Sequence, residues 1–527
     1  MAANSIKVRN FIFCAAFIFL NACSDQALFE PDTLRIAMGA EPDTLNPILA
    51  SDAYASNILD YVNDTLIDRN RDTLDFQPKL AERWEITSDH LQYIFHLRHG
   101  VHWQDGVEFT ADDVVYSFQK INDPKVEAPF LRANYIDIDR VEKIDSYTVK
   151  FIYKRPYFLG LSVCGAIPLI PKHLFEDGND FNSHPLNRKP IGLGPYRFEE
   201  WQTNKKIVLV RNEDYWGEKP AIKKIIFRII TDDAVAFQIL KKGELDFSNL
   251  RPIQWMRQTD STRFNQIFSK YKYLLPGFNY IGWNNQSPFF NDKKVRRAMT
   301  MMVDRQRLLE KIEFGLGQVI ESPFFVEAPQ YDTSLKNIAY DPEKAKALLK
   351  EAGWADTDGD GILDKDGKKF SFVFLYPAAS KFSERLAPIL KEDLAKVGIE
   401  MTIDRMEWAV FLERIEKKNF DATALGWSTG YEDDPYQVWH SSQAKMERGS
   451  NFISFENSEA DHFIESARTE FDPTLRNKLY DRFQEIIFDE QPYTFLFSTD
   501  SLVVVSKRFK NVIVHKTGLN TLEWKIE

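Results

Sequence analysis

The sequence predicts an α/β protein of more than one domain, on three grounds. Apolar residues at strand spacing alternate with runs at helical spacing, first between residues 190 and 277 and again beyond residue 369. The chain of 527 residues is long enough for two to four domains with sizeable cores. The sequence has no low-complexity linker, no block of like charges and no short repeat, so it gives no sign of loosely connected units.

The composition is that of a globular protein and narrows the class of partner. Hydrophobic residues make up 44% and charged residues 28% of the chain. The net charge of −11 argues against nucleic acid, because binding to phosphates requires clustered lysine and arginine. Of the three cysteines only Cys164 lies beyond residue 23, so we predict no internal disulfide and a buried thiol there.

The first 22 residues have the pattern of a secretory signal. Lys7 and Arg9 precede an apolar run at residues 11–20, which is shorter than the roughly 20 residues that span a bilayer. The sequence Leu-Asn-Ala-Cys at residues 20–23 resembles a lipobox, which implies lipid attachment at Cys23. We therefore expect a mature protein in the periplasm or cell envelope, anchored to a membrane through Cys23. An ordinary signal peptide is the alternative.

The region after the leader predicts a strand, a helix and then a compact hairpin unit. A short apolar strand at residues 34–37 precedes a helix predicted at residues 56–66. Between residues 91 and 97 apolar side chains occupy every second position, which is typical of a strand with one buried face. Asp105-Gly106 predicts a tight turn, and Thr110 followed by Asp113 predicts the start of a helix.

Strands and helices continue to alternate towards the C-terminus. Helices are predicted to begin near Asp232, Asp292, Asp341 and Asp472, and the last of them to end near residue 489. Two further helices are predicted at residues 384–397 and 408–418. Strands are predicted at residues 147–153, 206–211, 224–230, 370–376, 400–405 and 502–505.

The stretch from residue 80 to residue 121 also carries a family resemblance. It contains Leu-Ala-x-x-Trp-Glu from residue 80, Phe-x-Leu-Arg from residue 95 and Asp-Gly-x-x-x-Thr-Ala-x-Asp-Val from residue 105. In this order, these motifs resemble the signature segment of the peptide- and oligopeptide-binding lipoproteins of ABC transporters. Further similarity, in GLGPYRFEEW from residue 192, VLVRNEDYWG from residue 208 and ELDF from residue 244, extends the resemblance over residues 33–514.

The resemblance implies a large two-lobed periplasmic-binding-protein fold, with discontinuous domains joined by a hinge. Lobe I would comprise residues 32–67, 190–277 and 505–527, a small extra domain residues 68–189, and lobe II residues 278–504. It also implies a monomer whose lobes close on a peptide and deliver it to an ABC permease in the membrane. Neither catalysis nor a cofactor is required for that function.

Two segments are implied as contacts to the main chain of a peptide ligand. They are Ser51, Asp52 and Ala53 in one lobe and Gly426, Trp427 and Ser428 in the other. Side chains of the ligand would enter roomy, hydrated pockets, so we expect a broad sequence preference. A surface loop before the first helix is the alternative for the segment at residues 51–53.

Aromatic and acidic residues follow the second segment. Related peptide-binding proteins have an aspartate three residues after a Gly-Trp pair, where it binds the peptide amino group, but this chain has Gly430 there. A buried amine requires a carboxylate, so Glu432 or Asp433 is expected to take that role. The candidate ligand contacts here are Tyr431, Glu432, Asp433 and Asp434. The alternative is an exposed acidic loop on an aromatic core.

Residues 356–367 resemble a calcium-binding loop, with Gly361 at the required sixth position. The oxygen ligands at positions 1, 3, 5, 7 and 9 would be Asp356, Asp358, Asp360, Ile362 through its carbonyl, and Asp364. Position 12 is Gly367 instead of the bidentate glutamate, which removes the strongest ligand. A hairpin turn without metal is therefore favoured over a structural calcium site.

Other patterns give little support to catalysis or to a transition metal. His96, His99 and His102 lie in a strand-and-turn stretch, where a spacing of three sends successive side chains to opposite faces. Gly160-Leu-Ser-Val-Cys164 lacks the final glycine of a nucleophile elbow. The alternatives to peptide binding are a binding protein of the same family for a nickel complex, haem or an oligosaccharide and, more distantly, a surface adhesin or a hydrolase.

Overall fold

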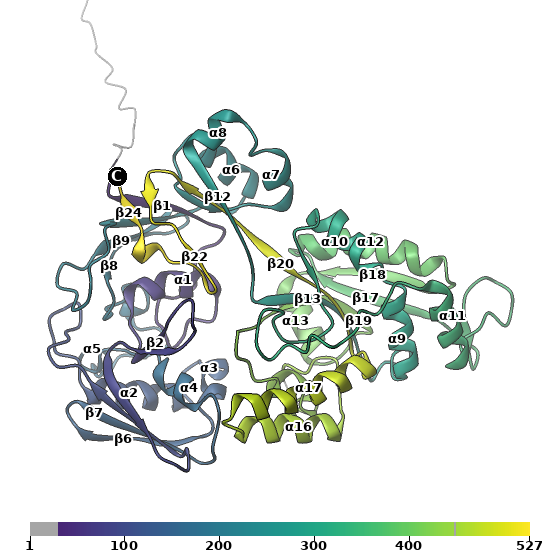
Figure 1. Cartoon of the computed structure of the whole chain (residues 1–527), viewed down its shortest axis with the longest axis horizontal. Helices are drawn as coiled ribbons and strands as arrows, with labels where there is room; N and C mark the ends of the chain where they lie inside the picture. Colours follow the sequence, from purple (N-terminus) through teal and green to yellow (C-terminus); the bar gives the residue numbers. More distant parts are fainter. Residues whose placement is uncertain (1–29, 447–448) are drawn as a thin grey trace, which may run out of the picture.

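The computed structural model describes residues 30–446 and 449–527, and its mixed strands and helices confirm the predicted α/β class. Figure 1 shows two halves, side by side, with β20 (Tyr493–Ser506) running from one into the other and β13 (Gly277–Trp283) in the right-hand half. Within the described ranges, no helix is both long and apolar enough to cross a membrane.

One continuous series of paired strands runs through both halves. In the half that we call lobe I, the series contains β8 (Tyr196–Gln202), β9 (Lys206–Arg211), β10 (Lys224–Ile229), β1 (Thr33–Met38) and β11 (Phe247–Asn249). In the half that we call lobe II, it contains β13, β19 (Ala422–Ser428), β17 (Ser371–Pro377) and β18 (Glu400–Met406). Each lobe consists of its named strands and the helices packed on them, and the domain limits implied by the resemblance stay predictions.

The strand β20 belongs to both lobes. Its first part pairs with β13 as far as Phe497, and its second part pairs with β12 (Phe268–Leu274) from Asp500 onward. The prediction of a strand at residues 502–505 was therefore too short. Almost every side chain of β20 is buried, so its sequence lacks the alternation by which a strand with one exposed face is found.

A separate sheet forms the small domain below lobe I in Figure 1. Its strand order is β4 (Ala81–Ile86), β5 (Gln92–Leu97), β7 (Thr148–Tyr153) and β6 (Ile138–Asp145), and α2 (Ala111–Asn122) packs on it. The predicted strand at residues 91–97 and the helix start after Thr110 are confirmed. The backbone N–H of Thr110 donates to Asp113 Oδ2 at 2.9 Å, as expected for a capping box.

Aspartate residues begin most of the predicted helices. Asp232, Asp292, Asp341 and Asp472 cap α6 (Asp233–Lys241), α9 (Lys293–Met301), α11 (Pro342–Glu351) and α17 (Pro473–Glu490). The helix predicted at residues 56–66 is displaced, because α1 spans Ala53–Val62. Asp52 Oδ1 accepts the N–H of Ala55 at 2.8 Å, and this cap, which we did not predict, moves the start of the helix to Ala53.

Candidate ligand-binding site

The end of β19 offers a backbone edge on which an extended ligand could lie. On one side, β19 pairs with β13 along its whole length, so that Gly277 lies opposite Ser428. On the other side, β17 pairs only with Ala422 and Thr423. In the described part of the chain no strand therefore covers the second edge of β19 at Gly426, Trp427 and Ser428. An open strand edge can add a peptide as a further strand.

The side chain of Trp427 supports this edge from inside lobe II. Its ring is parallel to those of Phe452 and Tyr280, with centroids 5.8 and 6.4 Å away. Its indole N–H donates to the hydroxyl of Tyr493 at 3.2 Å. The aromatic stack fixes this ring, and the backbone of Trp427 is paired with Phe278 of β13, so the backbone groups left for a ligand are those of Gly426 and Ser428. Gly426 and Ser428, on either side of it, are exposed.

The segment predicted in lobe I lies at the N-terminus of α1. Asp52 uses its carboxylate to cap the helix, while Ser51 and the first helical residue, Ala53, are exposed. The carboxylate of Asp52 therefore has a structural task. Any ligand contact from this segment would come from the exposed Ser51 and Ala53 or from backbone groups.

The acid loop, which we define as Glu432, Asp433 and Asp434, uses its two outer carboxylates to join separate parts of the molecule. Glu432 forms ion pairs with Arg69 and with Arg476 of α17, each at 2.9 Å. Arg69 belongs to the hairpin of β2 (Ile67–Arg69) and β3 (Phe76–Pro78), which lies outside lobe II. Glu432 is therefore already neutralised by two guanidinium groups and is a poor partner for a ligand amine.

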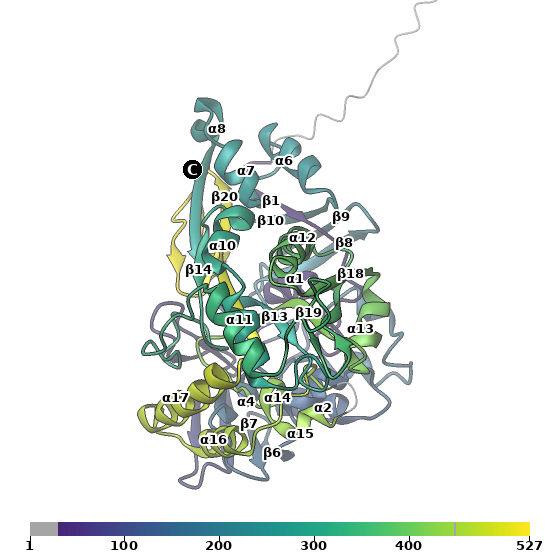
Figure 2. The same ribbon diagram turned by 90° about the vertical axis from the view of Figure 1, so that its right-hand side faces the viewer.

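Asp434 makes the second of these connections. Its Oδ2 accepts the hydroxyl of Tyr157 at 3.0 Å and the Nε–H of Arg468 at 2.8 Å. Arg468 lies near the end of α16 (Ser458–Thr469), in lobe II, whereas Tyr157 lies in the small domain. Arg468 also reaches Asp137 of the small domain at 3.4 Å, and its carbonyl accepts the N–H of Phe158. Figure 2 likewise shows α16 and α17 beside the small domain.

Asp433, between these two residues, has no cationic partner among the described residues. Its backbone is fixed by Gln330, which accepts its N–H at 2.7 Å and donates to its carbonyl at 2.9 Å. Its Oδ1 accepts the N–H of Asp434 at 2.9 Å, and Oδ2 makes no hydrogen bond or ion pair with the described chain. Burial raises the pKa of Asp433 to about 6, with a further contribution from the neighbouring charge of Asp434. An unpaired, partly buried carboxylate is suited to binding a cationic group.

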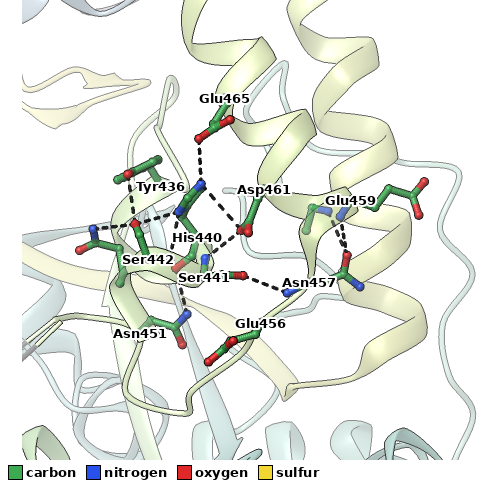
Figure 3. A network of polar contacts seen from close by, with 12 residues as sticks. Tyr436, His440, Ser441, Ser442, Asn451, Glu456, Asn457, Glu459, Asp461 and Glu465 are labelled. Carbon is green, nitrogen blue, oxygen red and sulfur yellow. Dashed lines mark hydrogen bonds and ion pairs between the residues drawn. The ribbon is translucent and has the colours of Figure 1, made fainter. Parts of the chain in front are cut away.

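A polar network fixes the segment that follows the acid loop (Figure 3). His440 contacts Glu465 of α16 through Nε2 at 3.2 Å and Ser442 through Nδ1 at 2.8 Å. The N–H of Ser441 donates to Asp461 Oδ1 at 2.8 Å. The acid loop and the helix that carries Arg468 are thus held to each other, so the position of Asp434 relative to Arg468 is set locally.

Tyr431 and Gly430 complete this part of the site. The hydroxyl of Tyr431 lies 3.1 Å from Glu327 Oε2 and 3.2 Å from the carbonyl of Lys516, a residue of the C-terminal tail. Burial, followed by the charge of Glu327, raises the pKa of Tyr431 to about 12, so this hydroxyl stays protonated. Gly430 supplies no carboxylate.

The last residues of the predicted calcium loop belong to a short hairpin. Asp364 and Lys365 pair with Lys369 and Lys368, and the turn between them contains Asp366 and Gly367, both with positive φ. Carboxylate oxygens of Asp356, Asp358 and Asp364 lie within 4.8 Å of one another, but Asp360 forms an ion pair with Lys369. For Ile362, the fourth predicted ligand position, only an N–H bond to Asp360 is seen. Calcium binding stays a prediction.

Cys23 lies outside the described residues, and Cys164 is a buried free thiol, as predicted. His96 contacts Glu85 at 2.9 Å and His102 contacts the carbonyl of Gly100. Sequence reasoning missed Arg69, Tyr157, Arg468 and Arg476, the partners of the acid loop. No local motif marks them, because they come from segments far apart in the chain.

Comparison with known proteins identifies the family. The profile of the bacterial extracellular solute-binding proteins, family 5 Middle, matches residues 75–446. The oligopeptide-binding protein AppA of Bacillus subtilis (strain 168) is 33% identical over 96% of this chain and 96% of its own length.

Solved structures extend the comparison to the fold. AppA from Bacillus subtilis in complex with a nonapeptide superposes with a TM-score of 0.82 at 30% identity, covering 94% of this chain and 99% of that one. NikZ from Campylobacter jejuni, in complex with Ni(L-His), gives a TM-score of 0.80 at 26% identity, covering 94% and 100%. The chain belongs to the family 5 bacterial extracellular solute-binding proteins of ABC transporters, which bind solutes and are not enzymes.

Proposed function

We propose that this protein is the peptide-binding component of an ABC transporter, which captures short peptides outside the cytoplasm and delivers them to its permease. One observation carries the proposal: the open edge of β19 ends five residues before Asp433, a carboxylate without a cationic partner in the described chain. An open strand edge suits the main chain of a peptide, and an unpaired carboxylate suits its amino group. The likeness to AppA supports the same conclusion.

Binding on the edge of β19 recognises what all peptides share. Main-chain N–H and C=O groups of the ligand would pair with those of Gly426 and Ser428. The backbone groups of successive residues point to alternate sides of a strand, so these two residues face the same edge. The amino group would form an ion pair with Asp433. Because these contacts use no ligand side chain, we expect a broad sequence preference.

The two outer acids of the acid loop link ligand binding to closure of the lobes. Glu432 and Asp434 flank the proposed amine partner and contact Arg69 and Tyr157, which lie outside lobe II. A ligand that fixes Asp433 also fixes the acids on either side of it in the positions from which they make these two contacts. The ligand therefore favours the closed form by binding it more tightly than the open form.

Competition between matched peptides tests the proposal. Native mass spectrometry of the protein purified without refolding should reveal retained peptides, and a tetrapeptide should bind more tightly than its N-acetylated form. Small-angle scattering should show a smaller radius of gyration with the peptide than without it. Binding of a nickel–histidine complex, haem or an oligosaccharide, with no binding of any peptide, would contradict peptide transport and favour another solute.

We also propose that lipid on Cys23 anchors the protein to a membrane of the cell envelope. The lipobox-like sequence before this residue supports the proposal. The Cys23→Ser variant should move from the detergent phase to the aqueous phase in phase partition. If wild-type protein already partitions into the aqueous phase, the anchor does not exist.

A further inference from the structure

A cavity of about 750 Å³ lies in lobe I. Its walls include the ends of β1 and β10, one face of α1, parts of α6 and α7 (Pro252–Arg257), residues of β11, β12 and β20, and the tail at residues 517–522. None of its lining residues falls between Gly277 and Thr499, so lobe II does not contribute. The cavity can therefore persist when the lobes separate. Its volume is in the range of sites for small ligands.

The cavity begins where the edge of β19 ends. Leu275, which lines it, lies two residues before Gly277, and Gly277 pairs with Ser428. Two residues of chain span at most about 7 Å. On the other side, Tyr431 contacts the carbonyl of Lys516, next to the lining residue Thr517. Short stretches of chain thus connect the lining of the cavity both to the strand that pairs with the end of β19 and to Tyr431.

The acidic groups of the cavity differ in how they are neutralised. Asp233 forms an ion pair with Arg251, and Asp500 forms one with Lys272 at 3.3 Å. The carboxylate of Asp60 forms neither an ion pair nor a hydrogen bond with any described residue, although it lines the cavity.

The environment of Asp60 is that of a charged group at the wall of a hollow. Asp60 is exposed and lines the cavity, and the protein packed around it raises its pKa, because desolvation disfavours the charged form. Arg71 and Lys79 offset part of this effect from a distance. Arg71 also lines the cavity, but its guanidinium donates to Thr517 Oγ1 at 3.4 Å and not to Asp60.

We propose that this cavity receives a positively charged side chain of the bound peptide, lysine or arginine, and that Asp60 forms an ion pair with it. The inference rests on the proposed peptide function and adds a preference to it. The face of α1 supplies further suitable groups: Tyr54, Asn57 and Tyr61 line the same cavity at helical spacing. The two tyrosine rings can pack on the aliphatic stem of such a side chain while its charged end reaches Asp60.

The test measures the dissociation constants of tetra-alanine and of its single-substitution series, in which lysine or norleucine replaces each alanine in turn. Norleucine keeps the stem of lysine without the charge. For the wild-type protein, we expect lysine to bind about tenfold more tightly than norleucine at one position, the effect of one charge-assisted contact. In Asp60→Asn this ratio should fall to about one, while tetra-alanine binds as in the wild type.

Asp233→Asn is the matched control, because it removes a carboxylate of the same cavity that Arg251 already neutralises. It should keep the preference for lysine. A wild-type protein that binds tetrapeptides without such a preference, or a preference that survives in Asp60→Asn, overturns this inference and leaves the peptide function intact. If no tetrapeptide binds at all, the proposed function fails and this inference fails with it.

Discussion

Two acidic loops of this molecule look alike in sequence and differ in structure. The Asp-rich loop at residues 356–367 satisfies its carboxylates locally: Asp356 accepts the N–H groups of Gly359 and Gly361, and Asp364 accepts both the N–H and the hydroxyl of Thr357. The acid loop at residues 432–434 instead finds its partners in distant segments, and one of its carboxylates finds no cation in the described chain.

The difference shows that the partners of acidic residues, more than their number, indicate function. A loop whose carboxylates accept hydrogen bonds from neighbouring N–H and hydroxyl groups gains stability from them and needs no ligand. A carboxylate that is partly buried without a cation is costly to keep, so its presence is explained best by a ligand that supplies the cation. The four predictions that follow test this contrast.

The largest effect is expected for Asp433→Asn. Loss of the ion pair with the peptide amine should weaken binding of a tetrapeptide about 100-fold, which corresponds to roughly 2.7 kcal/mol. The N-acetylated peptide has no such amine and should bind both proteins equally in calorimetric titration. The control Asp358→Asn, in the Asp-rich loop, should change neither affinity. Equal weakening of both peptides in Asp433→Asn would show that this residue does not contact the amine.

The next effect concerns pH. Burial raises the pKa of Asp433 to about 6, and only the ionised carboxylate pairs with an amine. Affinity for a free peptide should therefore be highest near pH 7, fall about tenfold per unit below pH 6, and also decline above about pH 8, where the peptide α-amine loses its proton. The N-acetylated peptide should show a flat profile between pH 5 and pH 8. The same decline for both peptides would assign the pH dependence to another group.

A smaller effect is expected for Asp434→Asn. The amide keeps the cap on Tyr436 but weakens the contacts to Tyr157 and Arg468, which join the small domain to lobe II. The loss of roughly 1 kcal/mol should weaken free and N-acetylated peptides alike, by about fivefold. Scattering should show a larger radius of gyration at equal peptide concentration. Glu413→Gln, which removes an exposed ion pair on α13 (Trp408–Glu416), is the control and should behave as the wild type.

The smallest effect is expected from calcium. Three carboxylates of the Asp-rich loop lie close enough to share an ion, but Lys369 pairs with Asp360 and position 12 has no glutamate. Millimolar calcium added to chelator-treated protein should raise the melting temperature by no more than about 2 °C, as weak binding to the native state predicts. A large rise would show that this loop is a true metal site, and the absence of any shift would end the calcium hypothesis.

Local chemistry explains which elements could be predicted. The capping aspartates at positions 232, 292, 341 and 472 act on the helix that directly follows them, so the cap and the helix can be recognised together in one short stretch of sequence. The alternating strand at residues 92–97 is defined in the same way. Pairing between distant segments cannot be recognised from the sequence of either segment alone. The length of β20 depends on β13 in one lobe and on β12 in the other, and neither is visible from its own sequence.

The same difference between neighbouring and distant residues separates the parts of the candidate site that could be predicted from those that could not. The segment at residues 426–428 and the acids at 432–434 could be named from the sequence because they are continuous in it. The sequence could not say which acid remains unpaired, because that depends on Arg69, Tyr157, Arg468 and Arg476. Asp60 was missed for a similar reason. It faces a cavity that is assembled from α1, the tail and residues of β20.

The strand β20 has a consequence for how the protein handles its cargo. Since one backbone, hydrogen-bonded on both sides of the crossing, carries both halves, opening has to twist and bend this ribbon without breaking it. Because this strand resists twisting and bending, it limits how far the two lobes can separate and favours one angle between them. Under the proposed function, a permease would have to bend this strand to release a bound peptide.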